Sequence, residues 1–84
     1  MLTVEIGLLE NGSFSEVVEI YFDKEGLDYL VARIDHIVQG KTDHANLMSE
    51  SWGLGDLTEE KQRNSNLLAH HLRLTLMDTG AHFS

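Results

Sequence analysis

Residues 2–22 decide the fold, and they read LTVEIGLLENGSFSEVVEIYF. Over residues 2–8, apolar side chains alternate with polar or small ones, which is the period of a strand with one buried face. The segment at residues 10–13 is rich in turn-forming residues, and alternation resumes over residues 16–22. On this second strand, Val18, Ile20 and Phe22 share one face, and the other carries Val17, Glu19 and Tyr21. The stretch therefore predicts an antiparallel β-hairpin.

A helix is predicted next, from Asp23 as its N-cap to Gly40 at its C-terminal end. Its apolar residues follow helical spacing and form one stripe: Leu27, Leu30, Val31, Ile34 and Val38. Gly26 weakens the first turn by about 0.5 to 1 kcal/mol relative to alanine, a cost that packing can offset.

Two further strands are predicted after the helix. Residues 44–49 alternate over a short length, and residues 68–76 form a long final strand with Leu68, His70, Leu72, Leu74 and Leu76 on one face. Between them, residues 51–66 indicate a long loop with one helical turn begun by Asp56, whose spacing to Glu59 fits a capping box. The tail at residues 79–84 is expected to fray.

The order strand-strand-helix-strand-strand predicts one α+β domain over residues 1–84, with a single helix packed on a four-stranded, mostly antiparallel sheet in two layers. One helix covers only one sheet face, so the opposite face is expected to lack a cover from this chain. Apolar residues on that face either form a partner or dimer surface or are ordinary scattered surface: Leu9, Val17, Tyr21, Met48 and Met77.

Charge and composition narrow the function classes. Fourteen acidic residues against six dispersed basic ones give a formal charge of -8, which disfavours nucleic-acid binding and favours a basic protein partner. The alternative is that the charge only keeps a small domain soluble, and charge by itself favours that interpretation. The chain has no cysteine, no signal-peptide pattern and no apolar run of membrane-spanning length, so we expect a cytoplasmic protein without a membrane partner.

No motif for catalysis or cofactor binding stands out. Consecutive His70 and His71 on a strand point to opposite faces, which leaves only a cross-strand meeting of His44 with one of them as a metal site. Asp43 and His44 are adjacent, yet neighbouring side chains diverge on extended backbone, and Asp43 is expected to order a turn instead. We therefore predict no enzyme activity, no metal and no cofactor.

Trp52 is the only tryptophan, and it directly follows a predicted strand. It either folds back over the small core or forms an interface anchor of the kind that dominates binding energy. Nearby carboxylates give the loop an acidic rim around this aromatic centre, provided by Glu50, Asp56, Glu59 and Glu60.

The segment GKTDHANLMSESWGLGDL at residues 40–57, with LLAHHLRLTLM at residues 67–77, resembles the immunity protein 32 family of bacterial polymorphic toxin systems. The corresponding positions are Gly40, Asp43, His44, Leu47, Met48, Trp52, Gly53, Asp56 and Leu57. Asn46 departs from the family pattern, where a second histidine is expected. The resemblance implies a small cytoplasmic protein that neutralises a cognate toxin by binding it.

The leading hypothesis is a non-enzymatic binding protein whose partner is a cognate, basic toxin. The residues expected to contact it are Asp43, His44, Glu50, Trp52, Asp56, Glu59 and Glu60. A homodimeric interaction domain is the alternative, and a metal-dependent hydrolase using His44 and His70 is a third.

Overall fold

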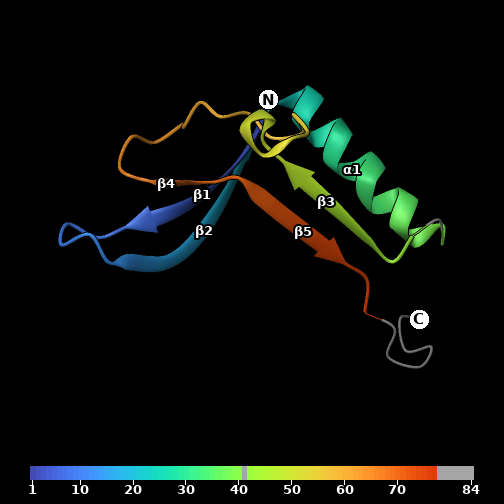
Figure 1. Ribbon diagram of the computed structural model, residues 1–84, viewed down its shortest axis with the longest axis horizontal. Coiled ribbons are helices and arrows are strands. Elements are labelled where there is room, and N and C mark those ends of the chain that lie inside the picture. The colour runs from blue at the N-terminus through green and yellow to red at the C-terminus, as the bar shows by residue number, and fades with distance from the viewer. Residues whose placement is uncertain (41, 78–84) are drawn as a thin grey trace.

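The computed structural model describes residues 1–40 and 42–77 and confirms an α+β fold with one α-helix (Figure 1). The expected frayed tail at residues 79–84 lies outside the described residues. No helix in the described part of the chain is long and apolar enough to cross a membrane. The elements follow the order β1 (Leu2–Leu8), β2 (Phe14–Phe22), α1 (Lys24–Val38), β3 (His44–Met48), the short helical turn η1 (Glu50–Trp52), β4 (Leu67–Ala69) and β5 (His71–Thr75).

The predicted hairpin is present as β1 and β2. Leu2 pairs with Phe22 and Ile6 with Val18 in antiparallel register, so the apolar residues of both strands share one face. β2 begins two residues earlier than the alternation indicates. The register shifts between Ile6 and Leu8, and there Glu16 adopts a left-handed backbone conformation with φ 66°. This irregularity is a β-bulge in an edge strand.

Asp23 caps α1 as expected, because its carboxylate accepts a hydrogen bond from Gly26 N at 2.9 Å. The same carboxylate pairs with the amino group of Met1 at 2.6 Å. The amino terminus of the chain is thereby fixed against the first turn of the helix. At the other end, Gly40 follows the helix with φ 80°, which suits a C-terminal cap.

Gly26 is buried where the start of the chain crosses α1. A Cβ added there would lie 1.8 Å from the Met1 carbonyl oxygen, a backbone atom that cannot move independently. Gly26 is therefore required by packing, and its low helix propensity is the smaller effect.

Gly26→Ala is expected to lower the free energy of unfolding by about 2 kcal/mol or more, because the methyl group overpacks against backbone. Helix propensity alone would predict a gain of about 0.5 to 1 kcal/mol. Urea unfolding measures the difference, with exposed Glu25→Ala as the neighbouring control. A variant as stable as the native chain would contradict this packing.

The predicted four-stranded sheet is divided into two, with strand order β2-β1-β4 in one and β3-β5 in the other. The predicted long final strand breaks at His70, so that Ala69 pairs with Val4 of β1 whereas Leu72 pairs with Leu47 of β3. The bend also changes which residues face inward, from the odd-numbered Ala69 before it to the even-numbered Leu72 and Leu74 after it. Ala69, Leu72 and Leu74 all pack against the core, which corrects the prediction of one face running through residues 68–76.

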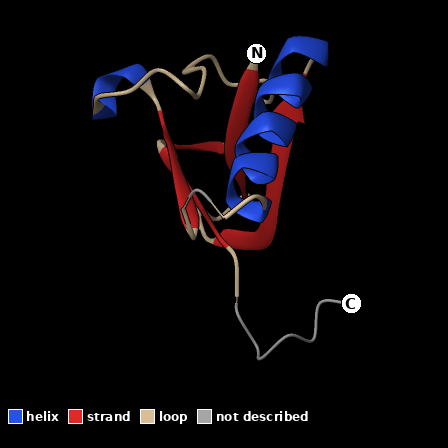
Figure 2. Cartoon of the chain, turned by 90° about the vertical axis from the view of Figure 1, so that its right-hand side faces the viewer, coloured by secondary structure: helices blue, strands red, loops and turns tan. Residues whose placement is uncertain are grey.

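α1 lies alongside β3, which pairs with β5, and it also contacts β2, from which the β2-β1-β4 sheet extends away from the helix (Figure 1). Figure 2 shows the helix running lengthwise along the strands, with η1 well apart from it. The buried apolar core lies between these layers and is small: Leu2, Val4, Ile37, Ala45, Leu47 and Leu57. The predicted helical stripe is wrong as the core face, because Val31, Ile34 and Val38 are exposed and Leu27 and Leu30 are only half-buried. The buried apolar residue of α1 is Ile37, which lies outside that stripe.

The far face of β1 is covered by this chain, contrary to expectation. Fully buried Glu5 accepts hydrogen bonds from Gln62 N at 2.8 Å, Asn66 Nδ2 at 3.1 Å and Arg63 N at 3.3 Å, so the loop at residues 58–66 folds over the strand. Thr3 Oγ1 adds a fourth donor at 2.7 Å. Burial acts to raise the pKa of Glu5, but these hydrogen bonds outweigh it and hold the pKa below its ordinary value.

This lowered pKa predicts a pH-dependent stability. When the pKa of a carboxylate is lower in the folded than in the unfolded state, ionisation stabilises the fold. This stabilisation is complete at pH values above the unfolded-state pKa and is lost as the pH falls through the folded-state pKa. We therefore expect the free energy of unfolding to decrease as the pH is lowered below about 4.5, the ordinary pKa of a glutamate side chain. Urea unfolding from pH 6 downward measures this slope, and Glu5→Gln should make it shallower. An unchanged slope would show that other carboxylates cause the loss.

Candidate binding surface

The segment after β3 forms one tight turn that presents Trp52. Ser49 N bonds to the His70 carbonyl at 3.0 Å, and Trp52 N bonds back to the Ser49 carbonyl at 3.0 Å. Gly53 then turns the chain with φ 112°, a left-handed conformation that favours glycine. The helical turn thus begins after Ser49, and the turn predicted at Asp56 does not form.

Trp52 is 58% exposed, which excludes the reading that it is the lid of the core. Its ring lies flat on the His70 imidazole, with centroids 5.8 Å apart and planes 3° apart. The His71 ring is also close, at 6.5 Å and tilted by 52°. The bend at His70 brings both consecutive histidines to Trp52, although a straight strand would have placed them on opposite faces. We call Trp52, His70 and His71 the aromatic platform.

Polar side chains hold the platform in place. Ser49 Oγ lies 2.7 Å from His70 Nδ1, and Ser51 Oγ and Glu59 Oε2 each lie 3.4 Å from the same nitrogen. Ser51 also donates a short hydrogen bond to Glu59. That bond, with smaller contributions from Ser49 and the His70 charge, holds the pKa of Glu59 below its ordinary range.

This Ser-His-Glu group is not arranged for nucleophilic catalysis. In a catalytic triad the nucleophile faces one imidazole nitrogen and the acid orients the other. Here both hydroxyls and the carboxylate gather on Nδ1 of His70, and Ser49 is fully buried. The arrangement fixes the orientation of His70, and through it that of Trp52.

The structure brings together three of the predicted contact residues, Glu50, Trp52 and Glu59, on and beside η1. Asp56 has a structural role, because it accepts hydrogen bonds from the Tyr29 hydroxyl and from Met48 N. This link ties the loop to α1. Glu60 is exposed one residue beyond Glu59.

Asp43 and His44 lie at the far end of β3 from the platform. The ladder pairs His44 with Thr75 and Met48 with His71, so His44 cannot meet His70 or His71 around one metal ion. Within residues 1–40 and 42–77, no three potential ligands are grouped for metal binding. The side chains of Asp43 and His44 do meet, at 2.7 Å, and this hydrogen bond is the main reason that the pKa of Asp43 is lowered.

Sequence reasoning identified the Trp52 loop but missed what supports it. The sequence alternates without interruption through His70, so the pattern gave no indication of the bend that brings His70 to Trp52. His71 is further held by a 2.9 Å hydrogen bond between its Nε2 and Asn46 Oδ1. The platform is therefore built by β3, η1 and the β4-β5 bend together.

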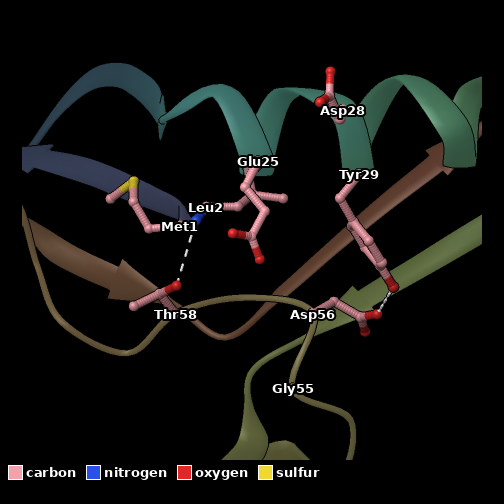
Figure 3. Close-up of a pocket in the computed structure, with 9 residues that line it drawn as sticks. Met1, Leu2, Glu25, Asp28, Tyr29, Gly55, Asp56 and Thr58 are labelled. Carbon is pink, nitrogen blue, oxygen red and sulfur yellow. Dashed lines mark hydrogen bonds between the residues drawn. The ribbon is translucent and has the colours of Figure 1, made fainter.

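A hollow of about 530 Å³ lies between the start of α1 and residues 55–58. Figure 3 shows the Glu25 carboxylate extending into it and Asp28 pointing away. Two other polar groups on its wall are paired, Tyr29 with Asp56 and Thr58 with Leu2 N. Among the described residues, Glu25 is the one carboxylate in the hollow without a hydrogen-bond or ion-pair partner, because Asp28 pairs with Lys24 and Asp56 with Tyr29, and this is too little to define a ligand site.

Comparison with known proteins gives no match to a family model, to a curated protein or to a solved structure.

Proposed function

We propose that this chain is an immunity protein that neutralises a cognate bacterial toxin by direct binding, without catalysis and without a cofactor. The exposed aromatic platform is the observation that carries this proposal. Trp52 is half exposed yet held flat against His70, so little side-chain freedom remains to be lost when a partner covers it. Rigid, partly exposed tryptophans are typical anchors of protein interfaces.

The charge around the platform favours a basic partner. Glu50 and Glu60 are exposed, and neither side chain has a hydrogen-bond or ion-pair partner among the described residues. Together with the formal charge of -8, these carboxylates would attract a basic toxin and accelerate its association. The complex would cover the toxin's active site or its substrate-binding surface.

The test is co-expression with the toxin encoded next to this gene in the cytoplasm of a bacterial host. We expect the toxin to co-purify with this chain and its toxicity to be suppressed. Binding measured at increasing salt should show a falling association rate, because the attraction is between opposite charges. A toxin that neither binds nor loses toxicity would refute the proposal.

A second candidate is a homodimeric interaction domain with no toxin partner. It is favoured by the large apolar surface that the fold leaves uncovered beside α1. The two candidates differ in what covers the platform. A dimer that buries Trp52 would leave that residue unavailable to a toxin, so the two candidates are distinguished by whether Trp52→Ala weakens self-association, measured by sedimentation, or toxin binding.

A further inference from the structure

The fold leaves an apolar surface uncovered on the same side as its core. Val18, Ile20 and Phe22 of β2 share the sheet face of buried Leu2 and Val4, since each lies opposite a β1 residue of that face. On α1, Ile37 faces the core, and the adjacent flank exposes further apolar side chains. We call this surface the open apolar face, made of Val18, Ile20, Phe22, Val31, Ile34, Val38, Leu67, Leu76 and Met77.

From this surface we infer that the chain forms a two-fold homodimer through the open apolar face, leaving the aromatic platform free. The face is a continuation of the core. Apolar grooves of about 220 Å³ and 340 Å³ run between α1 and the end of β5, and both are lined by Ile37, Val38 and Leu76. Obligate dimer interfaces resemble a protein core cut in half, which is the arrangement seen here.

The area fits a second copy. Large apolar residues expose on the order of 150 to 200 Å² each in an extended chain, so nine that are about half exposed contribute about 800 Å², one partner's share of a standard interface. The chain's own core holds six buried apolar residues. Small domains with limited cores are commonly stabilised by oligomerisation, and the partner always present during folding is another copy of the chain.

The charge pattern also separates this surface from the one proposed for a toxin. None of the nine residues is charged, and of the acidic side chains only Asp43 borders the grooves. On α1, Asp28 and Asp35 lie within one turn of Val31, but Asp28 is paired with Lys24 and Asp35 accepts a hydrogen bond from the Gln39 side chain. The uncharged residues of the face offer little to a basic toxin and suit contact between two copies of an acidic chain. Trp52 lies on η1, apart from α1 (Figure 2), so the dimer presents two platforms. This inference is independent of the proposed function.

Sedimentation velocity of the purified full chain, from low to high micromolar concentration, should show a dimer. Val18→Asp should weaken it about 100-fold or more, because the carboxylate would have to enter an apolar contact. Val17→Asp is the matched control, since Val17 is the adjacent residue of the same strand, is similarly exposed at 52% against 63%, and faces the other way. We expect this control to remain dimeric.

Thermal unfolding of the native chain tests the inference without relying on a variant that could fail to fold. The midpoint of a dimer rises with protein concentration, and that of a monomer does not. A native chain that is monomeric with a constant midpoint, or a Val17→Asp variant that dissociates as readily as Val18→Asp, would overturn the inference. A monomer in which Val18→Asp abolishes toxin binding would also overturn it and assign the face to the toxin.

Discussion

Glu5→Ala is expected to lower the free energy of unfolding by about 3 kcal/mol or more. The substitution removes an acceptor that is fully buried and bonded to four donors, two of them backbone N–H groups of the covering loop. Without the carboxylate, Gln62 N and Arg63 N have no acceptor unless the loop opens to water. Urea unfolding at one fixed protein concentration measures the loss.

Glu19→Ala is the control for this prediction. Glu19 lies directly opposite Glu5 on the same sheet face and accepts a hydrogen bond from the Tyr21 hydroxyl at 2.9 Å. It is half-buried and its only contact with the loop among the described residues is a long 3.4 Å hydrogen bond from Asn66 Nδ2, with none from the loop backbone, so its loss should cost about 1 kcal/mol. Equal effects of the two substitutions would show that Glu5 does not hold the loop.

Trp52→Ala is expected to weaken toxin binding by about 2 kcal/mol or more, which is about 30-fold in Kd. The free energy of unfolding should change by less than about 1 kcal/mol, because a side chain that is 58% exposed and stacked on one imidazole contributes little to the core. Calorimetric titration with the toxin and urea unfolding of the chain alone give the two values.

Phe14→Ala is matched to this variant, since Phe14 is an aromatic residue with 59% exposure that lies at the start of β2. Its loss should leave toxin binding unchanged. Trp52→Phe should retain most of the affinity, because a ring can still stack on His70. Binding that survives Trp52→Ala would show that the toxin contacts another surface, and the immunity proposal would then stand without the platform.

Local patterns predicted the hairpin and the helix ends well. Alternation over residues 2–8 and the turn after Leu9 require only neighbouring residues, and so does the cap from Asp23 to Gly26. These features depend on backbone sterics and short-range hydrogen bonds, which the sequence displays directly.

Features that depend on distant contacts were not predictable in this way. The break at His70 arises because β4 pairs with β1 and β5 with β3, and alternation says nothing about partners. Glu5 was assigned to a solvated face, since nothing near it in sequence indicates donors 57 residues away. The helix was predicted correctly but its buried face was not, because Ile37, which the predicted stripe omits, faces the core while Val31 and Val38 are exposed.

The same limit applies to the site. Asp43 and His44 were grouped with Trp52 because they are near it in sequence. In the structure they lie at the start of the five-residue strand β3, whereas Trp52 follows its end. Composition and position identified Trp52, whereas its support by His70 depends on a bend that the strand pattern concealed.

The bulge at Glu16 has a consequence for how this acidic chain behaves at high concentration. β2 is an edge strand, and a long, straight edge is a template on which identical strands add without end. The left-handed residue at position 16 lies where the pairing register shifts, so that the regular pairing of β2 runs from Val18 to Phe22. Open-ended polymerisation along this edge is thereby discouraged.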